Sequence, residues 1–253
     1  KVLWESLRVE NENLITGYRV TNGWARENYT YFAISLSKPI KNYGYTDREK
    51  PLYMGFWRKF NLQNNFPEIA GRKIVCHFEF GDDPSPLVVK VALSAVSTQG
   101  AVKNLEMEAR HRSFEQIARE AERKWEKELN VIEIVGDEDD KAMLYTSLYH
   151  TMINPSVYMD TDSLYRGIDH NIHRADGFTN YTVFSVWDTY RALHPLFNII
   201  NRERNKDMVH SMLAHYNQSV HKALPVWSHM GNENWCMIGY HSVSVLADAI
   251  DKG

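Results

Sequence analysis

The sequence predicts a chain of two parts, an incomplete antiparallel β-sandwich followed by helical hairpins arranged around a ring. Three observations predict this fold class. Hydrophobic residues alternate with a period of two up to about Val102, the period lengthens to that of a helix near Asn104, and helical segments joined by long aromatic-rich loops dominate after Gly136.

The first part is rich in β-branched and aromatic residues. Turn signals such as Asn22-Gly23, Lys38-Pro39 and Gly100 separate its strand-like segments. Because no segment of helical period interrupts them, the strands are expected to pair in antiparallel sheets that stack on each other. The expected strands cover residues 14–20, 29–36, 73–80 and 87–93, within a partial β-sandwich domain of residues 1–103.

A connecting segment is expected at residues 104–135. Its longer portion, 105–129, is charged on most faces and carries apolar residues at spacings of three and four, which is typical of a long amphipathic helix. The following residues, 131–135, resemble a brief strand that ends at Gly136. The segment is therefore predicted to be a helical linker between two domains.

Four helices are expected in the last part, residues 136–253. Asp137 to Asp140 place carboxylates where a helix N-terminus favours negative charge, and Asn154-Pro155 and Pro195 are expected to end the first and second helices. The expected helices cover residues 137–152, 182–197, 205–223 and 237–250. Both ends of the sequence look like cuts, so we expect a piece of a longer protein.

The composition excludes several classes of protein. The 253 residues contain 29 Lys and Arg against 32 Asp and Glu, so the chain has no positive charge with which to neutralise nucleic acid. No apolar run reaches the length of about 18 residues that a membrane span needs, and the first residues do not form a signal peptide. Two cysteines, Cys76 and Cys236, are too few for a disulfide framework.

Three loop segments of the helical part combine aromatic, carboxylate and amide side chains. They are residues 165–170, 184–191 and 225–235. Carbohydrate sites need this mixture, because the C–H faces of sugars stack on aromatic rings and the hydroxyls need paired donors and acceptors. The sequence therefore indicates a carbohydrate site, and a binding or structural role without turnover stays open at this point.

Two of these loops carry a resemblance to a known family. The segments Asn180–Pro195 (NYTVFSVWDTYRALHP) and Gly231–His241 (GNENWCMIGYH) resemble signature segments of glycoside hydrolase family 92, the bacterial α-mannosidases. Residues 17–24 and 28–32 are similar to the end of the N-terminal sandwich of that family. The resemblance implies an inverting, Ca²⁺-assisted hydrolysis of terminal α-linked mannose between a β-sandwich and an (α/α)₆ barrel, of which this chain holds the first helices.

By this resemblance Glu233 matches the general acid. A leaving glycosidic oxygen must be protonated as its bond breaks, and the apolar neighbours Trp227, Met230 and Trp235 disfavour the ionised form of the carboxyl. The residues that we expect to contact the substrate are Trp187, Asp188, His229, Asn232, Trp235 and Cys236.

An inverting enzyme needs a second carboxylate as base. The resemblance implies that this base and the main Ca²⁺ ligands lie downstream of residue 253, so the chain alone is expected to be inactive. It also implies α-1,2-linked mannose in N-glycans as substrate and a periplasmic or secreted location. Another α/α-barrel enzyme, such as a phosphorylase or a glucosidase, remains an alternative, and the sequence does not predict the oligomeric state.

Overall fold

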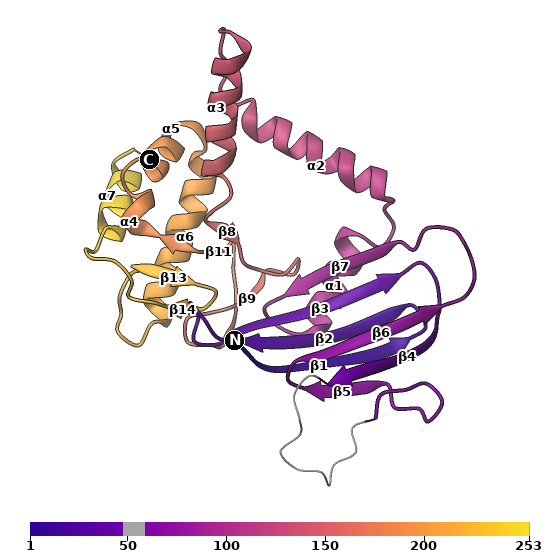
Figure 1. The fold of residues 1–253 in the computed structure, drawn as a ribbon. Coiled ribbons are helices and arrows are strands. Elements are labelled where there is room, and N and C mark those ends of the chain that lie inside the picture. The colour runs from indigo at the N-terminus through magenta and orange to yellow at the C-terminus, as the bar shows by residue number, and fades with distance from the viewer. Residues whose placement is uncertain (48–58, 253) are drawn as a thin grey trace. The chain divides into compact units, whose positions relative to one another are not determined.

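The computed structural model describes residues 1–47 and 59–252, and the chain divides into two compact units. Unit 1 is Lys1–His111 and unit 2 is Arg112–Gly253 (Figure 1). The predicted order of strands followed by helices is confirmed. The predicted domain limits at residues 103 and 135 stay predictions, and residues 48–58 and 253, which fall inside the predicted domains, lie outside the described residues.

The described part of unit 1 contains a five-stranded and a two-stranded sheet, both antiparallel. The strand order is β5-β1-β2-β3-β7 in the larger sheet and β4-β6 in the smaller one. The strands are β1 (Val2–Asn11), β2 (Leu14–Thr21), β3 (Asn28–Leu36), β4 (Ile40–Asp47), β5 (Glu68–Gly71), β6 (Ile74–Phe80) and β7 (Val89–Ser94). Four of them, β2, β3, β6 and β7, lie at the positions expected from the sequence.

The alternating residues of these strands build two apolar layers. Ile15 of β2 and Leu36 of β3 are buried with Ile40 and Tyr43 of β4, so this layer lies between the two sheets. On the other face of the larger sheet, small alanines of β3 and β7 pack against helix α1 (Thr98–Glu108). Alternation with period two thus buries one set of side chains against the second sheet, which confirms the predicted antiparallel sandwich.

Gly17, in the middle of β2, leaves no room for a side chain. A Cβ atom there would lie 2.2 Å from the carbonyl oxygen of Ser6 and 2.5 Å from Phe32 Cζ. Gly17→Ala is therefore expected to lower the free energy of unfolding of unit 1 by about 1–3 kcal/mol, measured by hydrogen exchange of the β2 amides. Gly23→Ala is the control, because nothing lies within 4 Å of that position and its exchange should not change.

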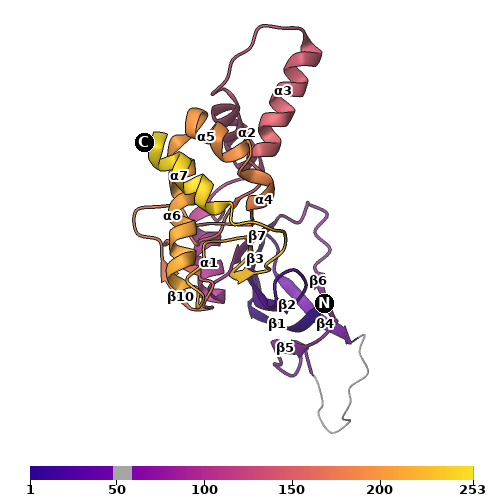
Figure 2. The same cartoon turned by 90° about the vertical axis from the view of Figure 1, so that its left-hand side faces the viewer.

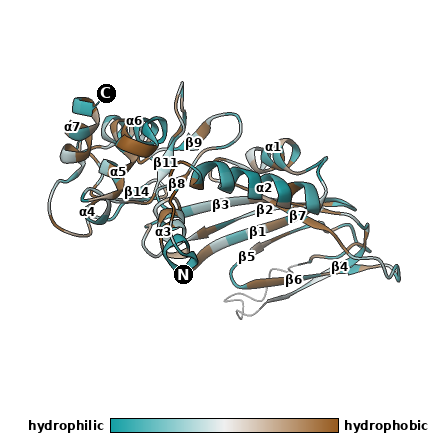
Figure 3. Cartoon of the chain, turned by 90° about the horizontal axis from the view of Figure 1, so that it is seen from above, coloured by the Kyte–Doolittle hydropathy of each residue, from teal (hydrophilic) through white to brown (hydrophobic). Residues whose placement is uncertain are grey.

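The single helix expected over residues 105–129 is wrong. Helix α1 ends at Glu108, and a separate helix, α2, spans Phe114–Leu129. Ser113 starts α2 with a capping box, in which its hydroxyl accepts from Gln116 N at 3.2 Å and the Gln116 side chain accepts from Ser113 N at 2.7 Å. The described α2 buries none of its residues and is predominantly hydrophilic in Figure 3.

The strand expected at residues 131–135 is also wrong. The carbonyl oxygen of Ile132 accepts a hydrogen bond from the Tyr145 hydroxyl at 3.1 Å, and Val135 is fully exposed. In a β-sheet this carbonyl group would accept a hydrogen bond from a neighbouring strand. Here the Tyr145 hydroxyl is its partner, so the apolar composition of the segment does not lead to a strand.

Helices and short strands alternate in unit 2. The helices after α2 are α3 (Glu138–Thr151), α4 (Val186–Thr189), α5 (Leu193–Ile200), α6 (Arg202–Gln218) and α7 (Ser242–Lys252). The strands are β8 (Ser156–Val157), β9 (Leu164–Arg166), β10 (Ile172–Arg174), β11 (Tyr181–Thr182), β12 (Phe184–Ser185), β13 (Trp227–His229) and β14 (Asn232–Glu233). Helix α3 follows the prediction, with Asp137 as its N-cap.

The other predicted helices are partly wrong. Residues 182–197 form strand and two short helices, because Val183 has a left-handed φ of 64° and Pro195 lies in the first turn of α5, where its missing N–H has no intrahelical partner. Helix α7 begins only at Ser242, since Met237 and Gly239 have φ of 72° and 89°.

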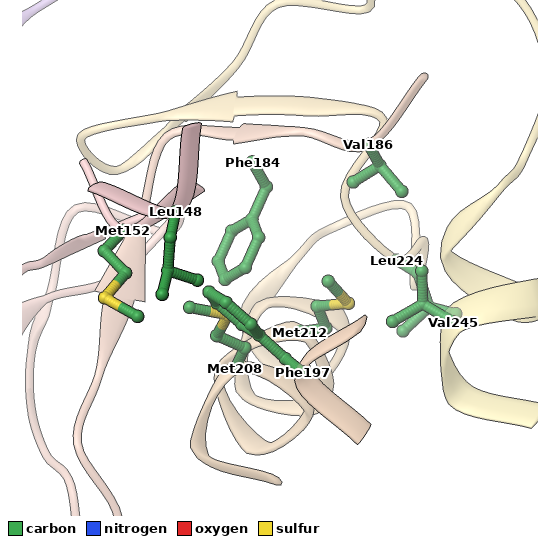
Figure 4. Packing of buried hydrophobic residues seen from close by; sticks show 9 residues of the cluster. All are labelled: Leu148, Met152, Phe184, Val186, Phe197, Met208, Met212, Leu224 and Val245. Atoms are coloured by element: carbon green, nitrogen blue, oxygen red, sulfur yellow. The ribbon is translucent and has the colours of Figure 1, made fainter. Parts of the chain in front are cut away.

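The core of unit 2 lies between α5, α6, α7 and the short strand β12. Figures 1 and 2 both show these three helices side by side. Figure 4 shows Phe184 of β12 facing Phe197 of α5 and the methionines Met208 and Met212 of α6, all of them buried. No helix among the described residues is both long and apolar enough to cross a membrane.

Candidate active site

Glu233 lies at the end of the β13–β14 hairpin. Ser228 pairs with Glu233 and His229 with Asn232, so Met230 and Gly231 form a two-residue turn, and both have left-handed φ, of 47° and 72°. Such a turn matches the twist of the two strands but strains a residue that carries a Cβ atom. The hairpin therefore holds Glu233 at a defined place with respect to the strand before it.

Three backbone N–H groups hold the Glu233 carboxyl. Oε1 accepts from Trp227 N at 2.8 Å and from Trp235 N at 3.0 Å, and Oε2 accepts from Val226 N at 3.0 Å. Trp235 has a φ of 52°, and this left-handed conformation accompanies the return of its N–H to the carboxyl. The Glu233 side chain is only 6% exposed. The carboxyl is thus buried, and the contacts that hold it are polar peptide groups.

The first signature segment lies beside the β13–β14 hairpin that carries Glu233. Phe184 and Ser185 of β12 pair with Ser228 and Trp227 of β13, which gives a three-stranded sheet in the order β12-β13-β14. A second contact joins this segment to the hairpin where Met230 N donates to Thr182 Oγ1 at 2.7 Å. Helix α4, which carries Trp187 and Asp188, starts directly after β12.

The predicted residues on α4 have local partners. The guanidinium of Arg191 lies 4.7 Å from the centre of the Trp187 ring, and the hydroxyl of Ser185 donates to Asp188 Oδ2. Asp188 is exposed and Trp187 is half-buried. A stacked aromatic ring beside an exposed carboxylate is the pairing that a sugar requires, with the ring for its C–H face and the carboxylate for a hydroxyl.

The predicted residues around the hairpin differ in exposure. Trp235 is 48% exposed and meets the His221 ring edge-on, whereas Asn232 is buried and donates to Met230 O at 3.0 Å, a role within the turn. Cys236 is a half-buried free thiol. His229 stacks on Trp227, and burial lowers its pKa, so its ring is neutral near neutral pH.

One group beside Glu233 was missed by the sequence reasoning. His215 of α6 lies with its Nε2 3.7 Å from Glu233 Oε2, and its side chain is 9% exposed. Desolvation lowers the His215 pKa to about 4. The signal was present in the sequence, since His215 follows Met208 and Met212 at the spacing of one buried helix face.

Comparison with known proteins agrees with this arrangement. The family model of the glycosyl hydrolase family 92 N-terminal domain matches residues 1–94, and that of the glycosyl hydrolase family 92 catalytic domain matches residues 100–253. No curated protein matches the chain.

Several solved structures are similar over nearly the whole chain. The family GH92 α-mannosidase BT3965 from Bacteroides thetaiotaomicron, solved alone and with mannoimidazole, is 44% identical over 98% of this chain, with a TM-score of 0.89. The family GH92 inverting mannosidase BT2199 from Bacteroides thetaiotaomicron VPI-5482 is 27% identical over 99%, with a TM-score of 0.85. The chain spans only 32% and 33% of the length of BT3965 and BT2199. The matches confirm the predicted fold, a β-sandwich followed by part of an α/α barrel.

Proposed function

Because the chain belongs to glycoside hydrolase family 92, we propose that the full-length protein containing it removes terminal α-linked mannose from glycans with Glu233 as the general acid. The reaction inverts the configuration at the anomeric carbon, and α-1,2-linked mannose of N-glycans is the substrate. This chain supplies the acid and one wall of the site, and the whole protein supplies the activity.

The observation that carries the proposal is the hold on Glu233. A general acid must keep its carboxyl in one place relative to the glycosidic oxygen, and three peptide N–H groups fix both oxygens of Glu233 without using a side chain. Burial of the side chain also shields the carboxyl from bulk water. An ordinary surface glutamate would have neither feature.

Inversion needs a second carboxylate about 6.5–9.5 Å from the first, with a water molecule between it and the sugar. We place this base downstream of the present sequence. The structure of BT2199, a 27% identical relative whose name describes an inverting mannosidase, supports this stereochemistry.

The sugar is proposed to bind beside the β12–β13–β14 sheet, where the first signature segment lies beside the hairpin that carries Glu233. The aromatic rings are assigned to its C–H faces and the polar groups to its hydroxyls. The assigned residues are Trp187, Asp188, His229, Asn232, Trp235 and Cys236. The name of BT3965, an α-mannosidase solved with mannoimidazole, supports a mannose-shaped pocket.

Among residues 1–47 and 59–252, no three His, Cys, Asp or Glu side chains gather as metal ligands. We propose that the full-length protein requires Ca²⁺ through ligands downstream, and we assign no step of the reaction to the ion from this chain. The resemblance of the sequence to its family supports the requirement.

Removal of Ca²⁺ from the full-length protein is expected to lower α-mannoside hydrolysis by about 100-fold or more, since a bound cation supplies several kcal/mol of stabilisation. The measurement is activity after dialysis against a chelator and after added Ca²⁺. Mg²⁺ is the control, because it demands a smaller octahedral site and should restore less activity. Full activity after chelation contradicts the requirement.

A periplasmic or secreted location of the protein is proposed from the resemblance of the sequence to its family. Fractionation of the producing cells, with the mannosidase activity assayed in each fraction, tests this location.

A further inference from the structure

His215 on α6 is a buried titratable group to which the proposed function assigns no role. Its Nε2 lies 3.7 Å from Glu233 Oε2, and both side chains are nearly inaccessible to solvent. This distance is too long for a hydrogen bond, but catalytic hydrogen bonds are often long before substrate binds.

The contacts of Glu233 show which oxygen can carry its proton. Oε1 already accepts two hydrogen bonds, from Trp227 N and Trp235 N, whereas Oε2 accepts one, from Val226 N. Oε2 therefore keeps one lone pair that no peptide N–H uses, and this is where a proton on the acid would lie. A hydrogen acceptor on that side of Oε2 can hold such a proton in place.

We propose that His215 is a positioning residue for the general acid, a neutral imidazole whose Nε2 accepts the Oε2–H of Glu233 and keeps that proton in place until the glycosidic oxygen takes it. No proton passes to His215. The proton leaves Oε2 for the leaving group, and solvent returns one to Glu233 after the products depart. This inference rests on the proposed function of Glu233.

The other groups that face His215 agree with a neutral ring. His215 lines a cavity of about 30 Å³ together with Tyr158, Tyr165 and Arg166. Burial raises the pKa of Tyr158 to about 12 and also raises that of Tyr165, so neither is negative near neutral pH. The guanidinium of Arg166 disfavours a second positive charge in this cavity.

Because no acidic side chain is among the described residues that line this cavity, desolvation decides the state of His215. A neutral His215 accepts a hydrogen bond from a protonated Glu233, whereas a cationic His215 would favour the carboxylate. The two states predict opposite shifts of the pH profile, which makes the proposal testable.

The test compares His215→Leu and His215→Gln in the full-length protein, with kcat/KM measured for a mannose disaccharide between pH 4 and pH 9. Loss of the acceptor disfavours protonated Glu233, so the basic limb of the profile should move to lower pH by about one unit in His215→Leu. His215→Gln retains an amide oxygen as acceptor and should move it less. The KM for the disaccharide should change less than kcat.

His194→Gln is the matched control. His194 is fully buried in the same unit, and its Nδ1 pairs with Asn205 Oδ1 at 2.8 Å rather than with Glu233. The substitution of His194 should lower the stability of the protein without shifting the basic limb of the pH profile of kcat/KM.

Two results overturn the proposal. If the basic limb of His215→Leu stays in place, the imidazole does not act on the acid. If it moves to higher pH, His215 is a cation that holds Glu233 as a carboxylate. Either failure is distinguishable from failure of the proposed function, which would appear as unchanged disaccharide hydrolysis in Glu233→Gln.

Discussion

Replacement of Glu233 by Gln in the full-length protein is expected to lower kcat for a mannose disaccharide by about 100- to 10,000-fold, the usual contribution of a general acid. The amide oxygen of Gln can still accept from Trp227 N and Trp235 N, whereas Val226 N loses its acceptor, so most of the hold on the side chain is retained while the proton is lost. An aryl α-mannoside with a good leaving group needs little protonation and should lose far less.

The comparison of these two substrates is the measurement, with kcat and KM determined for each. Glu203→Gln is the matched control, because it makes the same chemical change elsewhere in unit 2. Glu203 is an exposed carboxylate in the first turn of α6. Equal and modest losses for both substrates would assign Glu233 a structural role. Sugar binding by the unchanged full-length protein without any hydrolysis would favour a binding function for this site.

Phe197→Ala is expected to lower the free energy of unfolding of unit 2 by about 3–5 kcal/mol. Phe197 is fully buried beneath Phe184, the residue of β12 that pairs with Ser228 of the acid-bearing hairpin (Figure 4). The substitution removes the aromatic ring and leaves a cavity between α5 and α6, which the surrounding structure fills only in part. Loss of this support is expected to loosen the β12–β13–β14 sheet as well.

Hydrogen exchange of the amides of α5 and α6 measures this effect within unit 2. Ile199→Ala on the same helix is the control, because Ile199 is 72% exposed and its loss should change the exchange little. Similar protection in Phe197→Ala and the unchanged chain would show that the helices are held by contacts other than this core.

Secondary structure could be predicted from the sequence where the local pattern of residues and the burial of their side chains favour the same element. The strands β2 and β3 alternate apolar and polar residues, and β2 buries Ile15 against the second sheet as that pattern requires. Helix α3 was predicted because Asp137 caps its first turn. In these elements the local preference and the tertiary contacts favour the same structure.

The prediction failed where a single hydrogen bond favoured a different structure from the one that hydrophobic periodicity or composition suggested. Periodicity joined α1 to α2 across the capping box of Ser113, and apolar residues at 131–135 suggested a strand whose Ile132 carbonyl is used by Tyr145. Pro195 was expected to end a helix but lies in the first turn of one. Each failure concerns where an element starts or ends, which depends on single hydrogen bonds more than on composition.

The roles of the candidate site residues stay predictions, and their geometry could not be predicted. The signature segments singled out Glu233 as a candidate acid, yet neither the three peptide donors nor His215 follows from the motif itself. These contacts depend on the pairing of β12 with β13 and on the face of α6 that is buried, which are properties of the folded unit. The order of residues in the motif does not contain them.

The hold on Glu233 has a consequence for how the site tolerates genetic change. The N–H donors at positions 226, 227 and 235 belong to the main chain. Most substitutions at these positions therefore keep the hydrogen bonds to the Glu233 carboxyl. Proline alone lacks the hydrogen that each position contributes. The side chains at these three positions can therefore vary while the Glu233 carboxyl keeps its contacts.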